Sequence, residues 1–242
     1  MAQSLARTDP SATPQGAKQQ VSPRRGRPGY DLESLLAVAV TVFNERGYDG
    51  TSMEDLSRRL GISKSSIYYH VDSKEDLLAL ALDRALDGLF RVAEDIESGT
   101  DTAIVRLERL VRGSVEVLAG RLPYVTLLLR ARGNTDTERT ALARRREFDQ
   151  IVAELVAEAE QDGDIRPDVD PAITARLLFG LVNSLVEWYR PGRRATSATE
   201  LADAVCAVAF DGLRIRRPGE VEGQTGRARN GTPTRGAPGD SR

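Results

Sequence analysis

The chain has 242 residues, of which 40% are hydrophobic and only one is Cys, and its formal net charge is −2. This charge excludes a uniformly basic nucleic-acid coat, and a single Cys excludes an intramolecular disulfide and is typical of a reducing compartment. No apolar run approaches the roughly 18 residues that a membrane-spanning helix needs, and the amino end lacks the apolar centre of a signal peptide. We therefore expect a soluble, intracellular protein of one large or two small domains.

The amino-terminal segment, residues 1–28, is rich in Pro, Gly, Ser, Gln and Ala and predicts a disordered arm. Residues 1–30 carry five basic residues and one acid, a balance of +4, whereas residues 75–216 balance at −6. Arg25 and Arg27 lie at the end of the arm, just before the first expected helix. They are equally consistent with a solvated tail and with contacts to phosphate or to a DNA minor groove.

Asp31 is the expected N-cap of a first helix that ends near Arg46. Gly47 follows as the residue that ends this helix. The apolar side chains recur at helical spacing and are those of Leu32, Leu35, Leu36, Ala39, Val40 and Phe43. This stripe predicts a small core shared with the two short helices that come next.

Residues 51–74 have the pattern of a helix-turn-helix. Thr51 followed by Glu54 has the spacing of a capping box and predicts the start of the first helix of this motif. Gly61 suits the left-handed conformation of a tight helix exit, so it predicts the turn. Ser63 is the expected N-cap of the next helix.

The second helix of the motif is expected over residues 64–70, with Ile67 directed inward. Its outward side chains include no acid and are those of Lys64, Ser65, Ser66, Tyr68, Tyr69 and His70. Hydroxyls, phenols and one cation can bind phosphates and base edges without repelling them, so this face predicts DNA recognition. The alternative is a pair of capped helices with a purely structural role.

Three further residues, Thr51, Ser52 and Lys74, lie at helix starts, where hydroxyl, backbone N–H and ammonium groups suit phosphate. The sequence therefore predicts that they contact the DNA backbone. Ser73 with Asp76 has the spacing of a third cap, which opens a long helix.

The run from residue 43 to residue 77 resembles the N-terminal domain of the TetR family of one-component transcriptional regulators. The matching residues are Phe43, Gly47, Tyr48, Thr51, Ser52, Leu56, Gly61, Ile62, Ser63, Ile67, Tyr68, His70, Lys74 and Leu77. Ser57 stands where the family usually has Ala, and Val71 where Phe is commonest, and we expect the fold to tolerate both. The resemblance implies an all-α fold, in which a three-helix helix-turn-helix DNA-binding domain precedes a larger helical domain that binds a ligand and dimerises.

Beyond this motif the sequence predicts a body of amphipathic helices. They are expected over residues 75–98, 102–120, 124–132, 136–161, 171–189 and 198–215. The first of them leaves the DNA-binding domain and enters the body. We divide the chain into a basic arm at 1–28, the DNA-binding domain at 29–74, the helical body at 75–216 and a disordered tail at 217–242.

The last two helices are apolar around more of their circumference than one packed face requires. In a chain with this resemblance, the excess implies a surface that pairs with its copy as a four-helix dimer interface. Ala204, Ala207 and Gly212 would permit close approach there.

The sequence contains no constellation for catalysis or metal binding. His70 is the only His, Cys206 lies in an apolar run, and no Walker or Gly-rich dinucleotide loop is present. We therefore expect no enzymatic activity, no metal and no cofactor.

The resemblance also implies a small-molecule pocket in the body. The segments at residues 163–168 and 188–192 resemble regulators of fatty-acid, steroid-ring and aromatic-acid catabolism, which respond to acyl-CoA thioesters. Arg side chains could bind CoA phosphates through paired hydrogen bonds, with surface charge and plain core packing as the alternatives. The candidate ligand-binding residues are Arg130, Arg145, Arg146, Phe148, Phe179, Asn183 and Trp188, with Arg132 and Arg144 as further cations.

We therefore expect a cytoplasmic, nucleoid-associated repressor. It would bind an inverted repeat in double-stranded DNA as a homodimer and be released by a small molecule, with acyl-CoA thioesters as the suspected class. The alternative is a ligand-independent DNA-binding or scaffold protein whose helical body only dimerises. No membrane partner is expected.

Overall fold

The computed structural model describes residues 31–97, 100–192 and 196–213. Within these ranges every regular element is an α-helix, which confirms the predicted all-α class. The helices are α1 (Leu32–Arg46), α2 (Met53–Leu60), α3 (Lys64–Tyr68), α4 (Lys74–Glu97), α5 (Ala103–Gly120), α6 (Leu122–Arg130), α7 (Asp136–Gln161), α8 (Pro171–Trp188) and α9 (Ala198–Leu213). The predicted arm, with Arg25 and Arg27, and the predicted tail lie outside the described residues.

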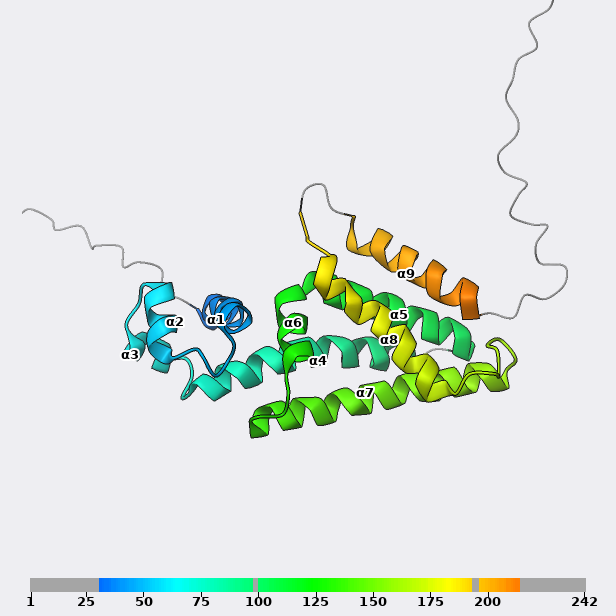
Figure 1. Cartoon of the computed structure of the whole chain (residues 1–242), viewed down its shortest axis with the longest axis horizontal. Coiled ribbons are helices and arrows are strands. Elements are labelled where there is room, and N and C mark those ends of the chain that lie inside the picture. The colour runs from blue at the N-terminus through cyan, green and yellow to red at the C-terminus, as the bar shows by residue number, and fades with distance from the viewer. Residues whose placement is uncertain (1–30, 98–99, 193–195, 214–242) are drawn as a thin grey trace, which may run out of the picture.

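The short helices α1, α2 and α3 form a small unit at one end of the molecule (Figure 1). α1 begins as predicted, because the Asp31 carboxylate accepts the backbone N–H of Ser34 at 2.8 Å. It ends at Gly47, whose φ of 81° lies in the left-handed region that favours Gly. Phe43 of α1 and Ile67 of α3 are buried in the core of this unit.

The 24-residue helix α4 leaves the N-terminal unit and runs into the body (Figure 1). The Ser73 hydroxyl opens it as predicted, since it accepts the N–H of Asp76 at 3.1 Å. α4 packs against α1 in the N-terminal unit and against α5, α6 and α7 in the body. Leu77 near its start and Ile96 near its end are both buried, so one helix contributes to the core at both ends.

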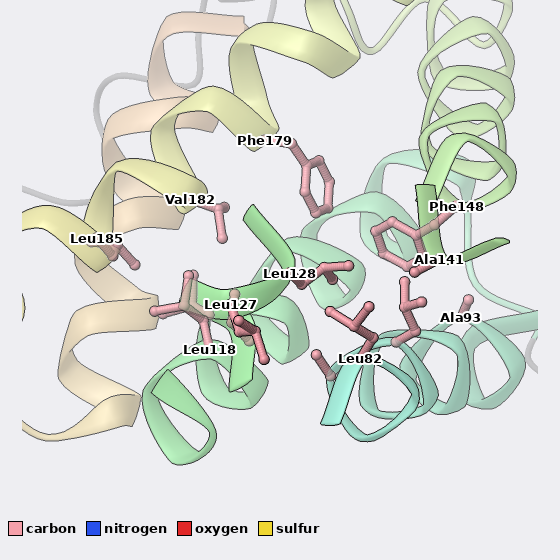
Figure 2. Close-up of a cluster of buried hydrophobic side chains, with 14 of the residues drawn as sticks. Leu82, Ala93, Leu118, Leu127, Leu128, Ala141, Phe148, Phe179, Val182 and Leu185 are labelled. Atoms are coloured by element: carbon pink, nitrogen blue, oxygen red, sulfur yellow. The ribbon is translucent and has the colours of Figure 1, made fainter. Parts of the chain in front are cut away.

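The body encloses an apolar core between α4, α6, α7 and α8 (Figure 2). Phe148 of α7 lies between Phe90 of α4 and Phe179 of α8, with ring centroids 5.9 Å and 5.3 Å apart. Both pairs meet edge to face, an arrangement that aromatic rings prefer to stacking directly face to face. These three rings therefore join three helices of the body.

α4 and α5 approach each other closely at two glycines. A Cβ atom on Gly88 of α4 would lie 2.8 Å from Cγ1 of Val117. A Cβ atom on Gly113 of α5 would lie 2.5 Å from Cγ1 of Val92. Each glycine thus receives a Val from the facing helix, and the two helices interlock along the middle and second half of α4.

α8 and α9 keep large apolar side chains on exposed faces, which we call the α8–α9 stripe. The exposed fractions are 51% for Ile173, 67% for Leu177 and 59% for Trp188 on α8, and 71% for Val208 on α9. The three α8 residues are separated by four and eleven positions, so they lie on one side of the helix. Exposed apolar side chains that gather into a patch often belong to interaction surfaces, so these residues are candidates for one.

Most of the predicted helix ends that fall within the described residues lie within one residue of the observed ends, and α3 and α6 show larger shifts. α3 ends at Tyr68, two residues early, because the chain tightens into a turn in which His70 N–H donates to Ile67 O at 2.9 Å. α6 begins at Leu122, two residues early. Pro123 is tolerated in its first turn, because backbone N–H groups there have no partner within the helix and Pro lacks one. No helix in the described part of the chain is long and apolar enough to cross a membrane.

Replacing Phe148 by Ala should lower the free energy of unfolding by about 3–5 kcal/mol, because it leaves a cavity where three rings meet. Urea titration at a fixed protein concentration measures this change. Glu147→Ala, at the exposed neighbouring position of α7, is the control and should change the value by less than about 0.5 kcal/mol. Equal losses in both variants would contradict the packing described above.

Candidate nucleic-acid interface

The capping box of α2 starts at Ser52, one residue later than predicted. Ser52 Oγ accepts the N–H of Asp55 at 3.2 Å, and the Asp55 carboxylate accepts the N–H of Ser52 at 3.0 Å. Ser52 and Asp55 therefore take the roles that the sequence assigned to Thr51 and Glu54. Both pairs have the same spacing, so the sequence alone did not separate them.

Thr51, a predicted phosphate contact, is turned into the N-terminal unit, and its role in DNA binding stays a prediction. Its side chain is buried, and its hydroxyl donates to the backbone carbonyl of Gly47 at 2.7 Å. Its backbone N–H donates to Tyr48 O at 3.1 Å. Both polar donors of Thr51 are thus used inside the N-terminal unit, which leaves Ser52 as the exposed hydroxyl at the start of α2.

The carboxylate of Asp55 is held in its ionised form at this helix start. Hydrogen bonds from the hydroxyl and the N–H of Ser52 hold the pKa of Asp55 below its usual value, and Arg58 and Arg46 act in the same direction. The guanidinium groups of Arg58 and Arg46 lie 3.3 Å and 3.6 Å from Asp55. A negative charge here also suits the positive end of the helix dipole.

The turn between α2 and α3 forms as predicted at Gly61, whose φ of 67° is left-handed. The Ser57 hydroxyl, at the position where Ala was expected, donates to Ile62 O at 2.6 Å and ties α2 to this turn. Leu56 and Ile67 are both fully buried, so they fix the face of α3 that is turned inward.

The start of α3 presents a cluster of hydroxyl groups. Ser63 caps the helix by accepting the N–H of Ser66 at 3.2 Å. The hydroxyls of Ser65 and Ser66 each lie 2.8 Å from Ser63 Oγ, and all three residues are exposed. Lys64 is exposed beside them and forms an ion pair with Glu54 of α2.

The other end of α3 presents aromatic side chains. Tyr68 is 48% exposed and Tyr69 is 86% exposed. The Tyr69 ring meets the His70 ring edge to face, with centroids 5.2 Å apart. Together with the serine cluster, these groups place exposed hydroxyls, phenols and a half-exposed imidazole along and just beyond a short helix.

Lys74 is oriented differently from the other predicted phosphate contacts. Its ammonium group donates to Tyr48 O at 2.9 Å and to Thr51 O at 2.8 Å. It also lies 4.1 Å from the centroid of the Tyr48 ring. The side chain therefore joins the start of α4 to the segment between α1 and α2.

The predicted ligand-binding residues occupy different parts of the body. Phe148 and Phe179 are buried together, and Figure 2 shows their rings directed toward the same apolar space. Arg146 lines an open cleft of about 240 Å³ between α7 and α8. Arg130 instead reaches α1 and donates to Asn44 O at 2.9 Å.

Two of the candidate ligand-binding residues, Trp188 and Arg144, do not face a pocket in the described part of the structure. Trp188 belongs to the exposed α8–α9 stripe, and its role in ligand binding stays a prediction. Arg144 bonds to Asp83 and Asp87 of α4 at 2.7 Å and 2.8 Å, so its guanidinium already has two carboxylate partners. The sequence did not reveal these partners, because they lie about 60 residues away along the chain.

Arg145 and Asn183 are both half-buried. Arg145 on α7 favours the ionised form of Asp149, whose pKa is nevertheless raised because burial disfavours its charge. Arg145, Arg146 and Asn183 are the predicted polar ligand-binding residues that lie on α7 or α8.

Comparison with known families matches two parts of the chain. Residues 35–81 match "Bacterial regulatory proteins, tetR family". Residues 100–213 match "Tetracyclin repressor-like, C-terminal domain". The first match contains α2 and α3, and the second contains α5 to α9.

Individual proteins match along most of their length. The HTH-type transcriptional repressor KstR2 of Rhodococcus jostii is 31% identical over 198 residues, which cover 78% of this chain and 93% of the relative. The solved structure of SCO3833, a TetR-family member from Streptomyces coelicolor A3, is 57% identical with a TM-score of 0.70, over 76% of this chain and 92% of that chain. AibR, solved with isovaleryl coenzyme A and operator DNA, is 27% identical with a TM-score of 0.62, over 74% and 97%.

Ser52→Ala should lower the free energy of unfolding by about 1 kcal/mol near neutral pH, because it removes the N-cap of α2. The lowered pKa of Asp55 means that its bonds to Ser52 stabilise the fold above the usual Asp pKa. That contribution is lost as the pH falls through the lowered value. The difference between wild type and variant should therefore shrink in acid.

Urea titrations of both proteins at about pH 7 and pH 3 measure this difference. Ser65→Ala is the control, because the Ser65 hydroxyl is exposed and caps no helix. A loss from Ser65→Ala as large as that from Ser52→Ala would contradict the assignment of the cap.

Proposed function

Because this chain belongs to the TetR family of bacterial transcriptional regulators, we propose that it is a repressor released from DNA by a small molecule. The observation that carries the DNA-binding part is the outward face of α3. There the exposed phenols of Tyr68 and Tyr69 adjoin three clustered serine hydroxyls. These groups match the phosphate oxygens and base edges of a major groove.

Within this proposal, the contacts divide by chemistry. Ser52 and Lys64, at the starts of α2 and α3, would bind phosphate, where hydroxyl and ammonium groups are exposed. Base edges would be contacted by Ser65, Ser66, Tyr68, Tyr69 and His70. Arg25 and Arg27 would add phosphate or minor-groove contacts from the arm.

We further propose that residues 29–74 recognise DNA and that residues 75–216 bind ligand and dimerise. The family matches at residues 35–81 and 100–213 support this division, with α4 shared between its two sides. The α8–α9 stripe supports dimerisation, because large apolar side chains gain stability from burial against a second copy. A dimer with one α3 per chain would read two half-sites of an inverted repeat about 34–36 Å apart.

The proposed ligand is an acyl-CoA thioester. AibR was solved with isovaleryl coenzyme A and operator DNA. The similarity of this chain to AibR supports the ligand class. Arg145 and Arg146 are the cations of this set that lie beside the α7–α8 cleft, where guanidinium groups could bind CoA phosphates. The acyl group would then enter the apolar space beside Phe148 and Phe179.

The size of the cleft supports release by displacement of helices. Its volume of about 240 Å³ is below the roughly 300–1,000 Å³ of pockets for drug-sized ligands. In this proposal, a bound acyl-CoA extends beyond the open cleft, and its acyl group enters the body by shifting α7 or α8. A ligand that binds only the shifted form displaces the equilibrium toward it.

Contacts between the body and the N-terminal unit supply a route from that shift to α3. Arg144 joins α7 to α4 through Asp83 and Asp87. Asn44 of α1 donates to Pro123 O of α6 at 2.8 Å. A coupling of about 1–3 kcal/mol between ligand and operator would lower operator affinity roughly 5–150-fold.

The second candidate is a ligand-independent DNA-binding protein whose body only dimerises. The aromatic cluster around Phe148 favours it, because buried, mutually packed rings are a filled core. In either case we propose a cytoplasmic, non-enzymatic protein that acts on the nucleoid. The named relatives reported above are transcriptional repressors or regulators.

Leu177→Arg should convert the homodimer into a monomer, because it places a charge in the middle of the α8–α9 stripe. Light scattering at micromolar concentration measures the mass. Glu94→Arg, an exposed change of charge on α4, is the control and should leave the dimer intact. A wild-type protein that is monomeric in this measurement would contradict the proposed dimer.

The whole proposal is tested by selecting duplexes from sheared genomic DNA and measuring their affinity by mobility shift. We expect an inverted repeat to be enriched. Tyr69→Ala should reduce the preference for this repeat over a scrambled duplex by about tenfold, since each good base contact discriminates by about 1–3 kcal/mol. Tyr69→Phe, which keeps the ring, separates loss of the hydroxyl from loss of stacking.

The same assay tests the ligand. A panel of acyl-CoA thioesters and the matching free acids is added to the wild-type complex, and we expect only a thioester to lower operator affinity. Arg145→Ala or Arg146→Ala should weaken that response and leave binding without ligand unchanged. If no thioester changes the operator affinity or the thermal midpoint, the acyl-CoA assignment is wrong and the DNA-binding assignment stands.

A further inference from the structure

α4 and α7 lie side by side and run in the same direction (Figure 1). Near the N-terminal unit, Glu75 of α4 accepts a hydrogen bond from the Thr137 hydroxyl of α7 at 2.9 Å. Deeper in the body, the rings of Phe90 and Phe148 meet edge to face, with centroids 5.9 Å apart. Between these two contacts, Arg144 of α7 reaches α4. The contacts therefore extend from the N-terminal unit to the core of the body.

The Arg144 guanidinium binds two acids of α4. One of its nitrogens donates to Asp83 at 2.7 Å and another to Asp87 at 2.8 Å. The two acids lie four positions apart on α4, where like charges repel each other across one helical turn. Arg144 supplies a positive charge to both of them, in a planar fork that a lysine lacks. Its side chain is only 30% exposed, and it holds two positions of α4 one turn apart.

The same guanidinium lies against an aromatic ring. Its central carbon is 5.3 Å from the centroid of the Phe90 ring, which is within the range of a cation–π contact. Phe148, one turn after Arg144 on α7, contacts this ring as well. Phe90 is therefore in contact with one cationic and one aromatic side chain of α7. A movement of the Phe90 ring changes the surface against which the guanidinium is oriented.

The Phe90 ring belongs to the aromatic cluster beside the proposed acyl space. Phe148 and Phe179 of α8 are both buried, with ring centroids 5.3 Å apart. Protein interiors are close-packed, so a group that enters beside Phe179 displaces its neighbours. A displacement of Phe148 would reach Phe90 and, through that ring, Arg144.

We propose that Arg144 is a positioning residue that couples the aromatic cluster of the body to the orientation of α4. This inference rests on the proposed function, because it concerns how an occupied acyl space alters DNA binding. Asp83 lies seven residues before Phe90, which is about 10.5 Å closer to the N-terminal unit along the helix axis. Arg144 thus carries a disturbance at the rings about two turns of α4 toward that unit.

The test is a double-mutant cycle that needs no ligand. Phe179→Leu removes the ring on α8 and represents a disturbance of the acyl space. Its effect on affinity for the selected operator duplex is measured in the wild-type protein and in Arg144→Met, which removes the charge and keeps an apolar stem. Substitutions at sites without shared partners have independent effects, whereas coupled sites do not.

We expect Phe179→Leu to change operator affinity by about threefold or more in the wild-type protein and by less than about 1.5-fold in Arg144→Met. Arg139→Met, the same change at another ion-paired arginine of α7, is the control and should leave the effect of Phe179→Leu in place. Equal effects of Phe179→Leu in the wild-type and Arg144→Met backgrounds, or no effect in the wild-type protein, would overturn the proposal.

Urea titration separates this coupling from a loss of stability. Partly exposed ion pairs contribute little to stability, so Arg144→Met should remain folded. Arg144→Lys carries the test if the Met variant does not fold. Lysine keeps the charge and lacks the planar fork, so we expect an effect of Phe179→Leu between those in the wild-type and Met backgrounds. An effect in Arg144→Lys equal to that in the wild-type protein would then count against the proposal.

Amide hydrogen exchange over residues 74–82 gives a second readout that needs no DNA. We expect Phe179→Leu to accelerate this exchange about threefold or more in the wild-type protein and to add no acceleration in Arg144→Met. Equal acceleration in both backgrounds would overturn the role of Arg144. A wild-type protein that binds no selected duplex would contradict the DNA-binding function, and the exchange measurement would still decide the role of Arg144.

Discussion

The N-terminal unit depends on α4, because α1, α2 and α3 span only residues 32–68 and can bury little apolar surface alone. Leu77, Leu78 and Ala81 of α4 are buried and complete the core beside α1. The same helix then packs against α5, α6 and α7. The N-terminal unit and the body therefore share one structural element, and neither can repack along α4 without affecting the other.

Local signals in the sequence predicted the helices of the N-terminal unit. Asp31, Ser63 and Ser73 cap the helices that they were expected to cap, and Gly61 forms the expected turn. The error at α2 has a physical cause, because adjacent hydroxyl residues each have an acid three positions later. Only burial of the Thr51 side chain, which depends on the folded unit, decides between the two registers.

The candidate sites could be predicted less well, because they depend on contacts between distant segments. The sequence identified α8 as too apolar for one packed face, but it did not separate the core side chain of Phe179 from the exposed one of Trp188. Helical spacing shows which residues share a face and not what covers that face. The bonds of Arg144 and Lys74 likewise join segments tens of residues apart, and the sequence gives no local sign of either.

Close packing at Gly88 and Gly113 holds the second half of α4 against α5, so a tilt of α4 about this contact displaces its first turn. Lys74 lies 14 residues before Gly88, a distance of about 21 Å along the helix axis. A tilt of roughly 10° about the glycine contact would carry the first turn of α4 by about 4 Å, which exceeds the roughly 3.4 Å rise of one base pair. Under the proposed function, small movements in the body would in this way become a displacement of about one base pair at the DNA.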